Sequence, residues 1–345
     1  MENKVTYVMI RTAVKKGIQD IRENPKRGVR NLVDLGEMFA TGPFQKEFFR
    51  NAAEELRNEK STFHLFAKNV VQNVNEQVLL TFGINLGYNS WTYGAGLIRS
   101  LEKKDQFNIP WIIFFDLNQK VNLSIEMIRD TIHQGKDMGT FCYIFDAKDD
   151  YKQMEKLIAL FEKETNCDFL LISSSDKINE LLIHGIKTAK NIAVALRVRD
   201  FRQPEVIESI KMLQEENCLS GALIEYEELN SEAGIKKALE EAHNLDIPLL
   251  FLKDINGPLQ GDQKKSKEMI DVVRSRLDVP VIPIDLWSDI ANIDRNISSE
   301  GCIMVIRGDG KAEMVNPDRK EITEDEFYIQ EVSLKNILEA GLPKR

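Results

Sequence analysis

Two apolar stretches, WIIFFD (residues 111–116) and GTFCYIFD (139–146), decide the fold, because each ends in aspartate and their ends lie 30 residues apart. Helical segments such as PEVIESIKMLQEE separate runs of this kind along the chain. Such alternation is typical of βαβ units, since a parallel neighbouring strand requires a crossover connection. The other β-rich runs are VLLTFGIN (78–85), DFLLISS (168–174), NIAVALRV (191–198), GALIEY (221–226), IPLLFLK (247–253) and VPVIPID (279–285).

The series predicts an α/β fold of the (β/α)8 type, a full or partial parallel barrel. A doubly wound sheet of two lobes is the alternative, and the barrel is favoured because no long linker interrupts the series. We expect an all-helical N-terminal module over residues 1–76 and the barrel over 77–300. Residues 301–345 are expected to form a β-hairpin, with Asp309-Gly310 at its turn, and a closing helix.

Composition limits the classes of function. The chain has 345 residues and a net charge of −9, with residues 1–76 carrying +3 and the remainder −12. An acidic body disfavours binding to nucleic acid. No apolar run approaches the roughly 20 residues that span a bilayer, and the N-terminus lacks the pattern of a signal peptide, so we expect a cytoplasmic protein. Basic residues beside Val8 and Ile10 could indicate a membrane-surface helix, but an amphipathic helix packed on the body is the favoured interpretation.

The cysteines and histidines do not predict a metal site. The four cysteines contain no CxxC pair, and the four histidines stand apart from one another. We expect the cysteines to be buried as small apolar residues on separate strands. A metal held by carboxylates alone stays open.

One candidate site lies in FGINLGYNSWTYGAGLIRS (82–100), interpreted as the turn from the first strand to a helix. Ligands of parallel sheets bind where such connections gather, at the carboxyl ends of the strands. Glycines allow close backbone approach, and amide and aromatic side chains offer hydrogen bonds and stacking surface. The alternative is that the aromatic residues pack the N-terminal helices against the barrel mouth. The candidate ligand-binding residues here are Asn85, Gly87, Asn89, Trp91 and Tyr93.

Charged residues at the other strand ends form a second group of candidates. Arg197, Glu225 and Lys253 fall within predicted strands, where an inward charge is costly unless it is paired or bound to a ligand. A mutual ion-pair network and a site for a polar or anionic ligand are both compatible with this pattern. Lys253 and Glu225 are the candidate catalytic residues, and a Schiff base at Lys253 is one chemistry they allow. The full set of strand-end candidates is Asp116, Asp146, Arg197, Glu225, Lys253 and Asp285.

Over about residues 76–341 the chain resembles the radical S-adenosylmethionine superfamily. The resemblance lies in a barrel whose first strand feeds a loop and a helix ending near Arg99. It also lies in GCIMVIRGDGKAEMV (301–315) followed by VSLKNILEAG, which is similar to the hairpin and closing helix of the peptide-modifying branch.

The motifs that carry radical chemistry in that superfamily are absent from the corresponding positions. The loop that should hold CxxxCxxC reads NLGYNSWTYGAG, the GGE position reads FFDLNQ, and the hairpin's second cysteine is replaced within Met314-Val315-Asn316. An iron–sulfur cluster in this loop would lack its thiolate ligands. No functional residue of the superfamily can be carried over, and the resemblance implies a relative without a cluster.

We therefore expect a protein that acts by binding a small molecule or peptide at the barrel mouth, as an accessory to a partner enzyme or as a ligand sensor. No cofactor is predicted, although S-adenosylmethionine bound without a cluster stays open. The N-terminal helices are a possible surface for a partner protein. One alternative is an active lyase or transferase that uses Lys253, Glu225 and the strand-end aspartates. Another is an interaction protein whose barrel mouth is filled by its own side chains.

Overall fold

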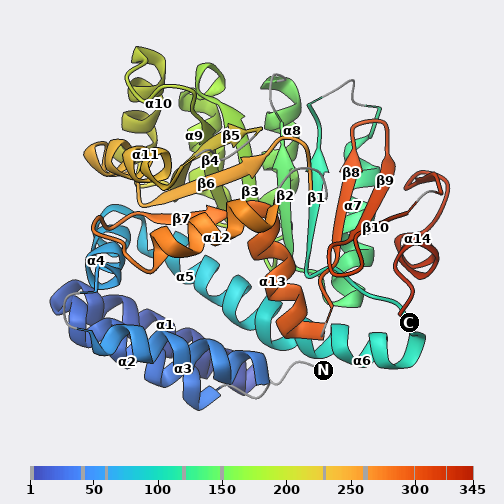
Figure 1. The fold of residues 1–345 in the computed structure, drawn as a ribbon, viewed down its shortest axis with the longest axis horizontal. Helices are drawn as coiled ribbons and strands as arrows, with labels where there is room; N and C mark the ends of the chain where they lie inside the picture. Colours follow the sequence, from blue (N-terminus) through green and yellow to red (C-terminus); the bar gives the residue numbers. More distant parts are fainter. Residues whose placement is uncertain are drawn as a thin grey trace.

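A computed structural model describes residues 4–39, 43–58, 61–118, 122–147, 151–227, 231–258, 263–298, 300–323 and 325–344. Gln119, the last residue of the FFDLNQ stretch, lies outside these ranges. A helical region comes first, and Figure 1 shows it beneath the sheet. Its elements are α1 (Lys4–Glu23), α2 (Pro25–Phe39), α3 (Pro43–Arg57), α4 (Phe63–Asn73), α5 (Glu76–Ile84), the π-helical segment η1 (Asn85–Gly94) and α6 (Ala95–Asp105).

One large sheet forms the centre of the molecule, and its strand order is β10-β9-β8-β1-β2-β3-β4-β5-β6-β7. The strands from β8 to β7 in that order are all parallel. The parallel strands are β1 (Ile112–Asp116), β2 (Cys142–Asp146), β3 (Asp168–Ser174), β4 (Ile192–Arg197), β5 (Ser220–Tyr226), β6 (Leu249–Asp254), β7 (Ile282–Asp285) and β8 (Ile303–Arg307).

Helices connect the parallel strands, as the alternating pattern predicts. Several begin at clear capping residues, for example Ser124 before α7 and Asn179 before α9, whose side chains accept hydrogen bonds from the first helical turn. The crossover helices are α7 (Ile125–Met138), α8 (Tyr151–Phe161), the single turn η2 (Ser175–Lys177) with α9 (Glu180–Ala189), α10 (Pro204–Glu215), α11 (Glu232–Asn244), α12 (Gln263–Arg274) and α13 (Leu286–Ser298).

The predicted C-terminal hairpin and closing helix are confirmed. β8 pairs antiparallel with β9 (Lys311–Asn316), and Gly310 takes a φ of +92° in the turn between them, a conformation that favours glycine. Two short strands, β10 (Glu321–Ile322) and β11 (Phe327–Tyr328), then pair with β9. The helix α14 (Leu334–Gly341) closes the chain.

The sheet is a partial barrel, opened between β7 and β8. Among the described strands β7 pairs with β6 alone, and α13 contacts β6, β7 and β8. The start of β1 is fastened to α13, because the backbone N–H of Trp111 donates to Asp294 Oδ1 at 3.1 Å. The indole of Trp111 also donates to the carbonyl of Ile290 at 3.0 Å. The helix α13 thus lies where β7 and β8 would pair with each other in a closed barrel.

The prediction of a strand over 78–85 is wrong, because these residues belong to α5 and the start of η1. Asn75 caps the helix through a hydrogen bond from the N–H of Gln77. One side of α5 packs on the N-terminal helices through Leu80 and Ile84. Another side reaches the start of the sheet, where Val78 contacts Ala193 and Leu219. A short helix that is buried on two sides is as apolar as a buried strand, so periodicity alone does not separate them. The eighth parallel strand is instead β8, the first strand of the hairpin.

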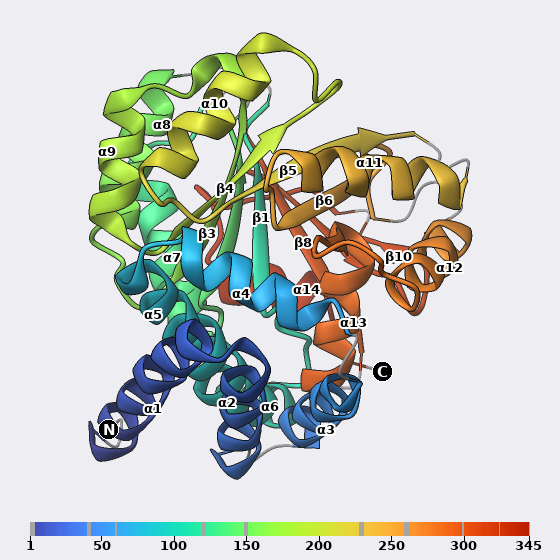
Figure 2. The ribbon, with the colours of Figure 1, turned by 90° about the vertical axis from the view of Figure 1, so that its left-hand side faces the viewer.

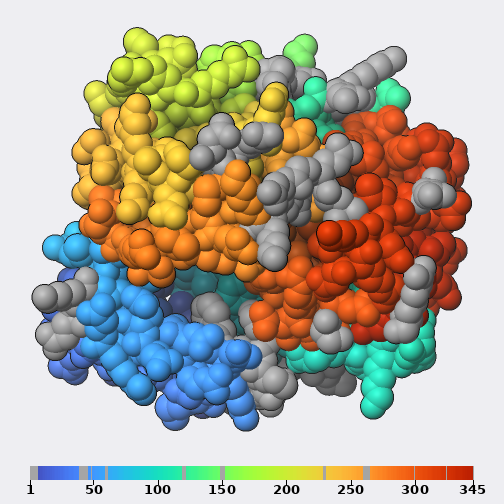
Figure 3. Space-filling view, in the orientation of Figure 1, coloured from blue at the N-terminus to red at the C-terminus, as the bar shows by residue number. Residues whose placement is uncertain are grey.

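The helix α5 closes the amino-terminal end of the partial barrel, and the N–H of Asn75 also donates to the carbonyl of Asn217 just before β5. Figure 2 shows α1, α2 and α3 below this end of the sheet, next to α6. On the face drawn in Figure 3, a hollow separates these blue helices from the orange part of the chain. The division of the chain at residues 76 and 300 into separate domains stays a prediction.

Candidate functional site

The register of the parallel strands brings five of the six strand-end candidates, all except Asp285, onto one face of the sheet. Asp116 lies opposite Asp146 on β2 and opposite Arg307 on β8. Glu225 lies opposite Lys253. Side chains two residues apart on a strand share a face, so the remaining pairings carry Arg197 to the same side. This is the inner face, since Leu170 and Leu249, which alternate onto it, pack towards α5.

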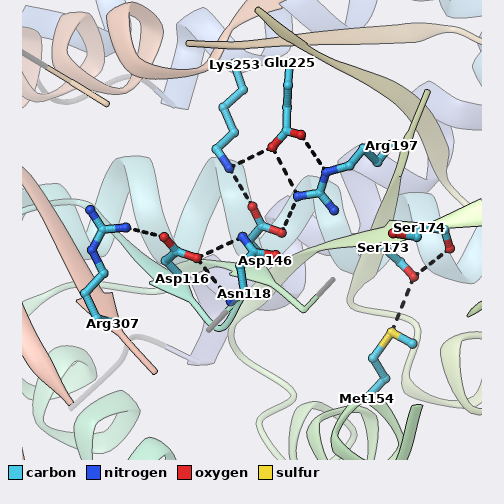
Figure 4. Close-up of polar contacts among 10 residues, drawn as sticks. All are labelled: Asp116, Asn118, Asp146, Met154, Ser173, Ser174, Arg197, Glu225, Lys253 and Arg307. Carbon is cyan, nitrogen blue, oxygen red and sulfur yellow. Dashed lines mark hydrogen bonds and ion pairs between the residues drawn. The ribbon is translucent and has the colours of Figure 1, made fainter. Parts of the chain in front are cut away.

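Four of these residues form a closed network of ion pairs, drawn in Figure 4. Arg197 donates through Nη2 to Asp146 Oδ1 at 2.6 Å and through Nε to Glu225 Oε2 at 2.9 Å. Lys253 Nζ lies 2.6 Å from Asp146 Oδ2 and 3.3 Å from Glu225 Oε1. Each cation therefore contacts both carboxylates, and the network carries no net charge.

Burial differs sharply among the members of this network. The side chain of Asp146 is 0% exposed, and those of Arg197 and Lys253 are 6% and 10% exposed. Glu225 is 26% exposed, so it is the member that solvent reaches. Lys253 Nζ also lies 5.4 Å from the ring centre of Phe114, and that ring packs 5.0 Å from the ring of Trp287 on α13. Aromatic side chains therefore form the floor beneath the ammonium group.

The charges shift one another's protonation equilibria. Burial alone would raise the pKa of Asp146, but the charges of Lys253 and Arg197 outweigh burial and hold that pKa below its ordinary value. The pKa of Glu225 is lowered in the same way, because the hydrogen bond and charge of Arg197 outweigh burial. Burial would lower the pKa of Arg197, but Asp146 and Glu225 raise it. The network is thus stable in its fully ionised form.

One donor of the network lacks a partner. Arg197 Nη1 is buried and makes no hydrogen bond within the part of the chain that the structure describes. In Figure 4 this nitrogen points away from both carboxylates. Ser174 lies beside Arg197 on the next strand, with which it is in register. A buried guanidinium donor without an acceptor is unfavourable, so this position suits a hydrogen-bond acceptor from a ligand or water.

The other strand-end candidates are arranged differently. Asp116 pairs with Arg307, which also contacts Glu313 at 2.7 Å. Asp285 lies opposite Leu252 and therefore faces the other side of the sheet from Lys253. There its backbone N–H donates a hydrogen bond to Asp289 Oδ2 at 3.0 Å, and burial raises the pKa of Asp285 to about 6. The prediction that Asp285 belongs to the same site is wrong, since strand register places it elsewhere.

The candidates of the 82–100 stretch are at the opposite edge of the sheet from the one expected. Asn85 Nδ2 donates to the carbonyl groups of Thr165 and Cys167, which precede β3, each at 3.0 Å. Asn89 donates to Asn85 at 2.9 Å and to the carbonyl of Asn166 at 3.0 Å. These amides hold the π-helical segment η1 against the residues that precede β3, at the amino-terminal edge of the sheet.

The rest of that stretch is packed against the same edge. The ring of Trp91 lies 6.0 Å from that of Trp111, and the ring of Tyr93 lies 6.0 Å from that of Phe141. Gly87 stands on the same π-helical segment. The prediction that these residues line the barrel mouth is wrong, because the stretch is helical throughout and precedes β1 instead of following a strand.

Sequence reasoning missed two residues at the carboxyl edge of the sheet, which is the edge where the parallel strands end. Arg307 was placed in an appended hairpin, although its strand pairs with β1. Phe114 lies two residues before Asp116 in WIIFFD, so strand alternation alone puts it on the same face. That alternation was the available signal for Phe114, whereas nothing in the sequence pairs β8 with β1.

The positions of the cysteines do not suit the iron–sulfur cluster that the sequence resemblance would suggest. All four are buried, as expected, and each lies at the start of a strand or just before one: Cys142 at β2, Cys167 at β3, Cys218 at β5 and Cys302 at β8. They are at the opposite edge of the sheet from Arg197 and Lys253, and burial raises the pKa of each thiol. Within the described residues no group of three or more His, Cys, Asp or Glu could hold a metal ion. The donor set at the carboxyl edge therefore does not suit an iron–sulfur cluster.

No described helix is long and apolar enough to cross a bilayer. No protein-family model matches the sequence, and no curated protein does so. Among solved structures, the fold is similar to that of SuiB from Streptococcus suis, both by itself and bound to precursor peptide SuiA. In both comparisons the identity is 12%, 81% of each chain is covered and the TM-score is 0.50.

SuiB bound to S-adenosylmethionine gives 12% identity over 80% of each chain, with a TM-score of 0.49. At this level of identity the likeness concerns the fold alone. It supports the predicted fold, a partial (β/α) barrel built on a parallel sheet.

Proposed function

We propose that the protein is a binding protein on a radical-SAM-like barrel and takes a carboxylate-bearing ligand at the carboxyl edge of its sheet, without cluster chemistry. It would serve as an accessory to a partner enzyme or as a ligand sensor. The observation that carries the proposal is the arrangement of two buried cations, Arg197 and Lys253, around one partly exposed carboxylate, Glu225.

Glu225 occupies the position that a ligand carboxylate would take. It is the most exposed member of the network, and its contact with Lys253 is longer than that of Asp146. Exchange of Glu225 for a ligand carboxylate keeps two cations and two carboxylates together, so no buried charge is left uncompensated. The spare Nη1 of Arg197 supplies a further donor for the ligand. Fully buried Asp146 would stay in place and hold the two cations apart.

Three ligand classes carry such a carboxylate: small organic acids, peptides, and the methionine portion of S-adenosylmethionine. The peptide class has additional support, because SuiB, which has a similar fold, has been solved bound to a precursor peptide. The N-terminal helices stay a candidate surface for a partner protein, and the cytoplasm stays the expected location.

An active enzyme that forms a Schiff base at Lys253 is less well supported by the contacts. A Schiff base requires an amine that a carbonyl carbon can approach, whereas Lys253 Nζ is already engaged by two carboxylates, Asp146 at 2.6 Å and Glu225 at 3.3 Å. Borohydride trapping of a carbonyl compound on Lys253 would favour the enzyme and contradict the binding proposal.

The test is a thermal-shift screen of organic acids, peptides with free carboxylates and S-adenosylmethionine, followed by calorimetry. We expect Glu225→Gln to bind a carboxylate ligand more tightly by about tenfold, because a competitor worth roughly 1.5–3 kcal/mol is weakened. Arg197→Lys should bind it more weakly. The matched control is Glu216→Gln, which removes a carboxylate paired with Lys187 on the outer surface. Equal affinities in the Glu225 and Glu216 variants would contradict the proposal, as would failure of every carboxylate to bind.

A further inference from the structure

An apolar cavity lies away from the carboxyl edge, between the N-terminal helices and the helical segments α5 and η1. Its volume is about 290 Å³. The walls come from α1, α2 and α3, and the floor comes from α5 and η1. The wall and floor residues that matter below are Ala13, Val14, Leu32, Phe49, Gly87 and Trp91.

Nearly all of the lining is apolar, and this limits what the cavity can hold. The polar side chains in it are those of Tyr88, Trp91 and Thr92. The hydroxyl of Thr92 is already engaged, since it donates to the carbonyl of Gly87 at 2.7 Å. An ordered water needs two to four polar partners, so such a cavity holds water poorly. An apolar ligand would bury its own apolar surface against these walls, which is favourable.

The floor of the cavity is kept open by its backbone. A Cβ added at Gly87 would meet no atom within 4 Å, so the space above this residue is empty of side chains. Gly87 belongs to the ten-residue π-helical segment η1. Such segments are rare and occur frequently at functional sites. A leucine or alanine at this position would form the helix more readily and would fill the space.

The size and lining of the cavity indicate the class of ligand. A closed apolar cavity of about 150 Å³ accepts benzene, and this cavity, which is partly open to solvent, has room at about 290 Å³ for a group with two fused rings. Aromatic side chains line it on two sides, from Phe49 on α3 and from Tyr88 and Trp91 on η1. Aromatic rings pack favourably in offset or edge-to-face arrangements. We infer that this cavity binds a small, uncharged aromatic molecule of bicyclic size.

The test uses indole as the probe, with the full-length protein and calorimetry or ligand-observed NMR. Gly87→Leu should fill the cavity and weaken indole binding by at least tenfold. The matched control is Gly96→Leu, because a Cβ at Gly96 also meets no atom within 4 Å, yet this residue does not line the cavity. Both variants replace an exposed helical glycine, so their effects on helix stability should be alike.

We expect wild type and Gly96→Leu to bind indole with equal affinity. Absence of indole binding to wild type would overturn the inference, as would equal affinity in the two leucine variants. Binding of a tryptophan-containing peptide without binding of indole would also overturn it, because the occupant would then be a partner chain. Should Gly87→Leu fail to fold, Ala13→Leu fills the cavity from the opposite wall and must show the same loss.

This inference does not depend on the function proposed for the carboxyl edge. Glu225→Gln should leave the affinity for indole unchanged, because Glu225 lies on the sheet and not in the lining of the cavity. Failure of indole to bind would leave the carboxylate experiments unaffected, so the two proposals can fail separately.

Discussion

Replacing Lys253 by methionine tests whether the charge network is a balanced unit. The change keeps an unbranched side chain beside Phe114 but removes one cation from a set of two cations and two carboxylates. Fully buried Asp146 would then keep a single cationic partner, Arg197. Breaking a buried ion pair from one side typically destabilises a protein by about 3–5 kcal/mol, and we expect a loss of that size at pH 7.

Urea unfolding at pH 7 measures this loss of stability. Two further variants test whether the loss comes from the buried network. Lys253→Met combined with Glu225→Gln restores neutrality, so it should recover about 1–3 kcal/mol relative to the sum of the single losses. Lys187→Met is the matched control, because Lys187 forms an exposed pair with Glu216 and should cost less than about 1 kcal/mol. A loss below about 1 kcal/mol for Lys253→Met, or strict additivity in the double variant, would refute a coupled buried network.

The pH dependence of the unfolding free energy is a second test of the Lys253→Met variant. The lowered pKa of Asp146 contributes stability that is present above the unfolded pKa and is lost as pH falls through the folded pKa. Loss of Lys253 removes part of that shift. The difference in unfolding free energy between wild type and Lys253→Met should therefore shrink between about pH 5 and pH 3. A difference that stays constant over this range would contradict the assignment.

Three further changes test other parts of the structure. Asp285→Asn should stabilise the protein at pH 7 by up to about 3 kcal/mol and give no gain near pH 3. The pKa of Asp285 is raised from its ordinary value of 3.8 to about 6, so the ionised carboxylate destabilises the folded state increasingly as pH rises through this range. Equal gains at both pH values in urea unfolding would contradict this. Asn85→Ala should cost about 1–3 kcal/mol by leaving the buried carbonyl of Cys167 and the part-buried carbonyl of Thr165 without this donor, while ligand affinity at the carboxyl edge stays unchanged by calorimetry. Gly94→Ala should lower the melting temperature, because its Cβ would lie 2.3 Å from the carbonyl oxygen of Gly139; a melting temperature equal to that of wild type would show that this backbone contact can relax.

Much of the fold follows from local features of the sequence. Runs such as DFLLISS and NIAVALRV are strands because their residues are buried on both faces of a parallel sheet, and the helices between them cover its outer side. VLLTFGIN has the same apolar character for another reason, since it is a helix held between the N-terminal helices and the start of the sheet. Only tertiary contacts distinguish these two environments.

The candidate site was predictable where topology alone decides it. Parallel strands end at one edge, so Asp146, Arg197, Glu225 and Lys253 were expected to lie together, and their contacts agree. Which face a side chain takes depends on register, which the sequence does not reveal; Asp285 is on the other face for that reason. The residues from Asn85 to Tyr93 failed as candidates at the mouth because their placement depended on the strand that is a helix.

The absence of cluster chemistry is the central claim, and iron and sulfide analysis after anaerobic reconstitution tests it most directly. We predict iron and sulfide well below one cluster per chain, because every thiol lies buried at the amino-terminal edge of the sheet. A stoichiometric cluster, with its visible absorption and paramagnetic signal on reduction, would contradict the account. It would also require ligands other than those that the carboxyl edge presents.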